Sequence, residues 1–323
     1  MNPDVAAAVA RLERDGVLTP ERARLFGRVA RRELVSIRPE LRLLLYGGVL
    51  AVMGGVGLLV QQNLDRIGPV AIAATLWIAA AGVLLWVLKH APAFSWGQAA
   101  SSHLALDYML LLGVLLTGAA LAYVEVKFTP LGASWSYHLL VMSAFAAVLA
   151  ARCDSRIVAS IAFSTFAAWR GASASTLEHA FWSGGGGAGS LRANAVITGL
   201  LFVGLGYALV RSGRKAHFEP VAAHLGWLLV LGAVLTGVGE SGAEGTGFRL
   251  ALFLVGSGLA AVAFRRGRFS LFGMGLVAAY IGLSAVVVDA SPEAALTFLW
   301  FSSTGIAVLA GLLLAHRAMR GRA

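Results

Sequence analysis

Long apolar blocks separated by short polar stretches make up most of the chain. Most of these blocks approach the roughly 20 helical residues that a lipid hydrocarbon core requires. Their apolar positions are continuous and do not alternate with polar ones, which favours helices over the strands of a membrane barrel. The pattern predicts an all-α fold, a polytopic transmembrane helical bundle of about ten spans. The predicted spans are residues 43–60, 68–88, 104–124, 134–151, 157–170, 193–210, 220–238, 248–264, 269–288 and 295–315.

Two details of the pattern concern helix ends and helix pairing. The prolines all fall outside the interiors of the predicted spans, and Pro69 and Pro220 stand at span starts, where a missing N–H group costs little. Gly206, Gly258 and Gly305 each precede a basic stretch, which hints at a repeated helical hairpin of roughly 50 residues.

The composition supports a membrane protein and removes nucleic acid as a partner. The 323 residues are 58% hydrophobic and only 13% charged, against about 25% charged in soluble domains. A net charge of +10 would indicate nucleic acid in a soluble protein, but here the arginines stand in short loops between apolar blocks. The expected partner is therefore the lipid bilayer. Cys153 is the single cysteine, so no intramolecular disulfide can form.

The basic residues predict the orientation. With the N-terminus inside, 21 of the 26 Lys and Arg residues lie on the cytoplasmic side and 5 on the outer side, as the positive-inside rule requires. The block 157–170 is short, and if it did not cross, the division would become 15 to 11. The larger asymmetry favours ten spans, with both termini in the cytoplasm of a bacterial inner (cytoplasmic) membrane.

Residues 1–42 predict a small cytoplasmic helical hairpin before the multispan domain (43–316) and a basic tail (317–323). Gly16 can end a first helix, Thr19 and Pro20 begin a second one as N-cap and first helical residue, and Pro39 is expected to stop it. Two short helices are too few to bury a core alone. We therefore expect this head to dock on the cytoplasmic loops or to bind a membrane protein partner. The alternative is that its arginines only stabilise the topology and hold anionic headgroups.

The N-terminal part of the chain resembles a known family. Residues 16–23 (GVLTPERA), a glycine-rich first span and residues 62–69 (QNLDRIGP) are similar to a bacterial family of predicted membrane proteins, domain of unknown function 2157. The resemblance covers about the first 90 residues, and Asn63-Leu64 stands where the family usually has Asn-Trp. It implies a short helical head joined to a multispan body, and no assigned activity.

The sequence holds no standard motif of catalysis or metal binding. The phosphate loop, His-Glu-x-x-His, Cys-x-x-Cys and Gly-x-Ser-x-Gly patterns are all missing from it. The expected function is thus non-enzymatic, with no catalytic residue, no cofactor and no metal site. A membrane glycosyl- or lipid-modifying enzyme is a weaker alternative, because Asp65 stands in a first outer loop too short to build an active site.

Asp107 is the one carboxylate placed inside a predicted span. Burying a charge there costs several kcal/mol at mid-bilayer and less near an interface. His103 is four residues earlier on the same helix face, and His224 is expected at a similar depth on the seventh span. Together these side chains could relay protons or bind a cation. The other interpretation is an ion pair of Asp107 with Lys89 or Arg211 at the level of the headgroups.

Polar residues on the outer side form a second candidate site. Asn63, Asp65 and His138 could converge to bind a ligand, although a solvated polar rim is the simpler interpretation. The sequence thus ranks a proton- or cation-coupled, transporter-like protein first. A membrane scaffold, a sensor or a subunit of a membrane complex, with its specificity in the head, is the alternative.

Overall fold

The computed structural model describes residues 11–16, 18–30, 38–98, 104–128, 135–174, 187–290 and 293–320. In this part of the chain there are twelve helices and no strand. Eight of the helices are long and apolar enough to cross a membrane. The all-α fold class and the multi-pass character are thereby confirmed. Contacts along the chain divide it into two compact units, residues 1–63 and 64–323.

The first unit holds helix α2 (Pro20–Ala30) and most of α3 (Arg38–Ile67). As the sequence predicts, α2 begins at Pro20, and the Thr19 carbonyl accepts the Ala23 N–H at 2.9 Å. Gly16 ends the preceding turn with a φ of 70°, a conformation that glycine adopts without a steric penalty. Residues 1–10, which include most of the first predicted helix, lie outside the described residues.

Helix α3 differs from its prediction at both ends. Pro39 stands in its first turn, where a proline is tolerated, and does not separate the head from the first span. Residues 61–67, expected as an outer loop, form its last turns. A helix keeps its backbone hydrogen-bonded beyond the apolar block, so hydropathy marks the block and not the helix ends.

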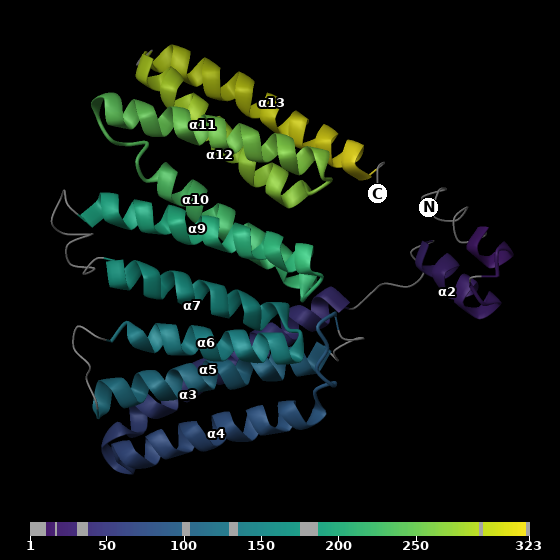
Figure 1. Ribbon diagram of the computed structural model, residues 1–323, viewed down its shortest axis with the longest axis vertical. Coiled ribbons are helices and arrows are strands. Elements are labelled where there is room, and N and C mark those ends of the chain that lie inside the picture. Colours follow the sequence, from purple (N-terminus) through teal and green to yellow (C-terminus); the bar gives the residue numbers. More distant parts are fainter. Residues whose placement is uncertain are drawn as a thin grey trace. The chain divides into compact units, whose positions relative to one another are not determined.

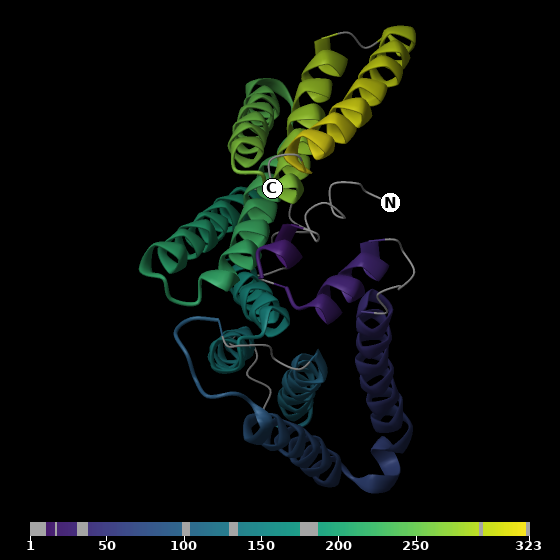
Figure 2. The ribbon, with the colours of Figure 1, turned by 90° about the vertical axis from the view of Figure 1, so that its right-hand side faces the viewer.

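The second unit is a succession of helices in chain order (Figure 1). Figure 2 shows the same order from the side, from blue α4 through teal and green to yellow α13. Each helix corresponds to one predicted span, with ends that differ by a few residues. The helices are α4 (Pro69–His90), α5 (Leu104–Lys127), α6 (Tyr137–Cys153), α7 (Arg156–Ala174), α9 (Gly187–Ser212), α10 (Glu219–Leu235), α11 (Gly242–Arg265), α12 (Phe269–Ala290) and α13 (Ala294–Arg320), with a 3-10 turn η2 (Ala216–Phe218) before α10.

These helices pack chiefly as antiparallel hairpins. The closest pairs are α4 with α5, α6 with α7, α9 with α10, and α11 with α12, in agreement with the hairpin repeat suggested by the sequence. Short connections force neighbours in the chain to be neighbours in space. In the α6–α7 turn, for example, Asp154 adopts the left-handed conformation and Ser155 caps α7 through its side-chain oxygen, which accepts the Val158 N–H at 3.4 Å.

In two of these hairpins, a pair of glycines lets the two helices of the hairpin approach closely. A Cβ atom on Gly199 of α9 would lie 2.5 Å from the Gly226 carbonyl oxygen of α10, and one on Gly226 would lie 2.6 Å from the Gly199 oxygen. Gly256 of α11 and Gly275 of α12 oppose each other in the same way, at 2.7 Å in both directions. Small residues allow such close approach of helix backbones in membranes. Each pair therefore behaves as one tightly packed element.

In this unit the small side chains are buried and many of the large apolar ones are exposed. The helix interfaces are rich in alanine, glycine and serine, whereas many large apolar side chains point outward. A soluble protein would bury most of these large side chains, so their exposure indicates a surface that contacts lipid. Examples of exposed side chains, with their exposed fractions, are Leu85 (67%), Val148 (68%), Leu254 (64%), Phe298 (72%) and Ile306 (70%).

Candidate functional site

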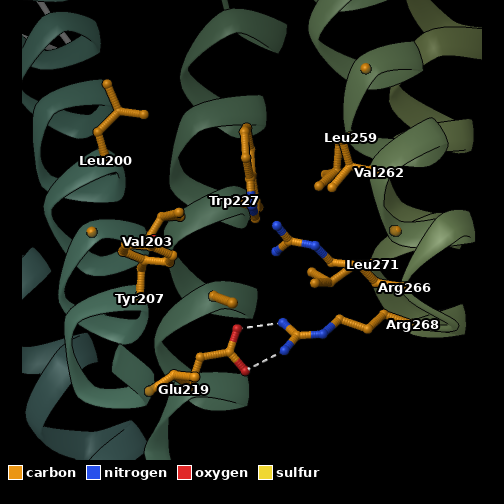
Figure 3. Close-up of a pocket in the computed structure, with 15 residues that line it drawn as sticks. Leu200, Val203, Tyr207, Glu219, Trp227, Leu259, Val262, Arg266, Arg268 and Leu271 are labelled. Atoms are coloured by element: carbon orange, nitrogen blue, oxygen red, sulfur yellow. Dashed lines mark hydrogen bonds and ion pairs between the residues drawn. The ribbon is translucent and has the colours of Figure 1, made fainter. Parts of the chain in front are cut away.

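A large cavity lies between the two glycine-packed hairpins, α9–α10 and α11–α12 (Figure 3). It has a volume of about 930 Å³ and is open on one side. We call it the groove. The two hairpins are each closed by their glycine contacts and pack more loosely against each other. The groove is therefore the seam between two rigid pairs of helices.

The wall of the groove is almost entirely apolar. Aliphatic side chains of α9 face those of α11 across it, and the Trp227 ring of α10 stands between them (Figure 3). Gly204 and Gly258 also line it, and a Cβ atom on either one would meet no other atom within 4 Å. The space beside these glycines is thus part of the groove. The aliphatic residues include Leu200, Val203, Leu259 and Val262.

One end of the groove is charged. Arg268, in the α11–α12 turn, donates two hydrogen bonds to Glu219 at the start of α10, one of them at 2.8 Å. This fork is a strong, oriented pair that neutralises both charges. Arg266 reaches into the groove toward Trp227 (Figure 3). Within the described residues its guanidinium has no hydrogen-bond or ion-pair partner, so it carries the uncompensated positive charge of the groove.

A buried polar cluster lies where three connecting loops meet. The Lys215 ammonium donates a hydrogen bond to the Asp154 carboxylate, and both side chains are about 95% buried. The His217 Nε2 atom lies 3.4 Å from the same carboxylate oxygen. The Lys215 ammonium lies over the Phe94 ring, 4.7 Å from the ring centre, in a cation–π contact. A charge this deeply buried is tolerated only when it is paired.

Backbone contacts extend this cluster to the α4–α5 loop. The Lys215 N–H donates to the Trp96 carbonyl at 2.7 Å, and Arg152 donates to the Pro92 carbonyl at 2.7 Å. The loops that close the α4–α5, α6–α7 and α9–α10 hairpins are therefore joined at one end of the unit. Ser155 is fully buried between them.

Asp107 lies in the first turn of α5, half-buried beside Cys153 and Pro92. The cavity there measures about 10 Å³, the lower limit for one water molecule. His224 of α10 is elsewhere: its Nε2 is 2.6 Å from the Ser270 hydroxyl of α12 and its Nδ1 is 2.5 Å from the Pro220 carbonyl. Among the described residues, these hydrogen-bond contacts of His224 do not include Asp107. His103 is outside the described residues, so the proposed relay stays a prediction.

The outer polar residues are distributed over different helices. His138, at the start of α6, lies 3.3 Å from the Glu125 carboxylate near the end of α5. Asn63 and Asp65 belong to the last turns of α3, and their side chains are outside the described ones. The structure therefore gives His138 an acidic neighbour that the sequence analysis did not pair with it, and leaves a site with Asn63 and Asp65 as a prediction.

Sequence reasoning missed the groove and the Asp154 cluster. In the sequence analysis, Arg266 and Lys215 counted only as loop charges that set the orientation. The available signal was that Asp154 stands between two arginines in a two-residue turn, where a carboxylate near the predicted membrane surface needs a partner. Which cation it would meet depends on helix packing, because Lys215 is 61 positions away.

In the described part of the chain, no group of three or more His, Cys, Asp and Glu side chains is arranged to hold a metal ion. Comparison with protein-family models, curated proteins and solved structures gives no match. The resemblance to domain of unknown function 2157 therefore stays an expectation drawn from residues 16–23 and 62–69. The structure shows an all-α chain whose eight long apolar helices make it a multi-pass membrane protein.

Proposed function

We propose that the chain crosses a bacterial inner membrane ten times, with both termini in the cytoplasm. Two helices decide between eight and ten crossings, because α6 has only 17 residues and α7 is not among the eight long apolar helices. The two pair with each other along their length. At 1.5 Å per residue, the 19 residues of α7 extend about 28 Å, which approaches the thickness of the hydrocarbon core.

Contacts at both ends of α7 support its crossing. Near its start, Asp154 pairs with Lys215 after the end of α9. Near its other end, the Arg170 carbonyl accepts a hydrogen bond from Asn194, close to the start of α9. Helix α7 therefore runs alongside α9, a helix long enough to cross. The basic residues at the Asp154 end agree with a cytoplasmic location for that end.

We infer that the protein is transporter-like and takes its ligand sideways from the membrane, an amphipathic molecule with an apolar chain and a polar head. The groove carries this proposal, because it combines a long apolar wall with arginine at one end. A site for a soluble ion would need polar groups along its wall. Proton coupling through Asp107 belongs to the same proposal, with cation coupling as its alternative.

The groove can be tested by filling it. Gly258→Phe adds a ring where a Cβ meets no atom within 4 Å, and Gly247→Phe makes the same change at an equally open position of α11 that does not line the groove. Binding of a two-chain phosphatidylethanolamine to the purified full chain is measured by native mass spectrometry. We expect Gly258→Phe to lose the tightest bound lipid and Gly247→Phe to keep it. Equal retention by both variants would contradict the proposal.

An exposed apolar face favours the scaffold as a second candidate. In the head, Leu12, Leu25 and Phe26 are 41%, 51% and 45% exposed. Such side chains on an amphipathic segment are typical of a binding surface. Deleting residues 1–38 separates the two functions: a groove protein keeps its lipid, whereas a scaffold loses a protein partner that copurifies with the full chain from native membranes.

A further inference from the structure

We propose that the groove selects an anionic phospholipid of the cytoplasmic leaflet, with its phosphate on Arg266 and one acyl chain along the apolar wall. This inference rests on the proposed function, because it names the ligand class of the same groove. It follows from the distribution of charge at the groove's end, from the side chains next to that charge and from the size of the cavity.

The charge at this end is not shared evenly between the two arginines. Arg268 donates two hydrogen bonds to the Glu219 carboxylate. This carboxylate is therefore already neutralised and does not repel an anion. Arg266 points into the groove and is exposed, with no partner in the described part of the chain. A guanidinium fits two phosphate oxygens at once, and it is less strongly hydrated than an ammonium. The groove therefore offers one unused phosphate-binding group.

The neighbouring aromatic residues fit a headgroup at this depth. Trp227 and Tyr207 line the groove on the α9–α10 side. Rings with one polar edge are typical of the boundary between acyl chains and headgroups. Beyond the Arg266 guanidinium the apolar wall continues with Leu200 and Leu259 (Figure 3). A phosphate on Arg266 thus places the start of an acyl chain at the start of the wall.

The volume and the side of the membrane agree with this ligand. About 930 Å³ is at the upper end of the range of ordinary ligand pockets, which suits one acyl chain with part of the glycerol, while the second chain stays in the bilayer. Arg266 belongs to a connection that the charge asymmetry assigns to the cytoplasmic side. The cytoplasmic leaflet carries the anionic lipids that attract basic side chains. A zwitterionic lipid would bring its ammonium group toward Arg266 and bind less well.

The chain offers a matched pair of variants for the test. Arg266→Gln removes the charge in the groove, and Arg265→Gln removes the same charge from the adjacent exposed residue, which does not line it. Phosphatidylglycerol and phosphatidylethanolamine with the same acyl chains are titrated separately against the full chain in detergent, and bound lipid is counted by native mass spectrometry. We expect Arg266→Gln to weaken phosphatidylglycerol binding about tenfold, the loss typical of one charged hydrogen-bond partner, and Arg265→Gln to change it little.

Each outcome decides one of the two proposals. Equal weakening by both glutamine variants means that the effect is general surface charge, and it overturns the selection by Arg266. Wild type could bind both lipids equally while Gly258→Phe loses both. The groove would then bind a lipid without selecting its headgroup, and only the inference about Arg266 would fail. If Gly258→Phe retains both lipids, the proposed function fails as well. Arg266→Lys keeps the charge and loses the fork, so we expect it to lie between wild type and Arg266→Gln.

Discussion

Asp154 and Lys215 form a buried ion pair in which both partners have left-handed backbones, with φ values of 55° and 49°. Such values are uncommon outside glycine, and for lysine they carry a steric cost. Each residue stands in a different connecting loop, so the pair joins two hairpins by their turns. The Lys215 conformation is held on both sides, by Asp154 at the side chain and by the Trp96 carbonyl at the N–H group.

Removing one partner of this pair should destabilise the fold strongly. Asp154→Asn leaves the Lys215 ammonium buried without its counter-ion, and we expect a loss of about 3–5 kcal/mol in the free energy of unfolding. The measurement is reversible unfolding or thermal melting of the purified protein. Glu240→Gln is the control, because it breaks the partly exposed Arg192–Glu240 pair, which should cost only about 0–1 kcal/mol. Similar losses for both variants would show that the buried pair contributes no more than a surface pair.

The glycine crossing of α9 and α10 predicts a position-dependent response to alanine. Gly226→Ala puts a methyl group against the Gly199 carbonyl and should cost about 1–3 kcal/mol, as overpacking does elsewhere. Gly232→Ala, on the same helix, meets no atom within 4 Å and should be neutral or slightly stabilising, because alanine favours the helix. Melting temperatures of the two variants check this, and equal melting temperatures would show that the crossing does not depend on glycine at Gly226.

Reporter fusions test the ten crossings and the orientation together. Fusions at Ser212, Gly242, Gly267 and Ser291 should report cytoplasm, outside, cytoplasm and outside, in that order. They all follow α7, so the four signals invert if only one of α6 and α7 crosses. A further fusion at Ser155, in the α6–α7 turn, should report cytoplasm for ten crossings and outside for eight. Fusions before α6 are the internal control, since their location does not depend on α7.

The small cavity beside Asp107 predicts how cations affect the melting temperature of the protein. A cavity of about 10 Å³ has room for about one water molecule, so a cation could enter it only without most of its hydration shell. We expect Na⁺, K⁺ and Mg²⁺ to shift the melting temperature of wild type and Asp107→Asn alike at each pH from about 5 to 8, the range around the usual His pKa. A cation-dependent shift that Asp107→Asn abolishes would support the cation site, and a pH-dependent difference alone would favour the proton relay.

Hydrogen exchange tests the head. Helix α2 should protect its amides around Leu25–Val29 if the head docks on a protein surface, because an isolated helix of 11 residues is marginal in water. Exchange as fast as in an unstructured peptide would show that the head is undocked in the purified protein. Repeating the measurement in native membranes then distinguishes a missing partner from an intrinsically unfolded head.

The fold could be predicted from the sequence because it depends on local pattern. A long apolar block can satisfy its backbone in lipid only as a helix, so Pro69 correctly marked the start of α4. The ends failed where helices continue through polar residues, as α3 does to Ile67 and α13 to Arg320. Hydropathy contains no information about where such a polar helical turn stops.

The groove and the buried pair depend on packing that no local pattern encodes. Gly204 and Gly258 read as ordinary small residues of a span, and only the relative position of two hairpins makes them line one groove. Arg266 and Arg268 are equivalent in a count of basic residues. Glu219, 49 positions before Arg268, distinguishes them by neutralising one and not the other.

The hairpin arrangement also bears on how the protein is made. Each glycine-packed pair is complete within one continuous stretch of chain, so it can associate as soon as its two helices have left the ribosome and entered the bilayer. The seam between α9–α10 and α11–α12 forms only after both pairs exist. If the groove binds a lipid as proposed, a lipid that lies between the two pairs when the seam forms would be its first occupant.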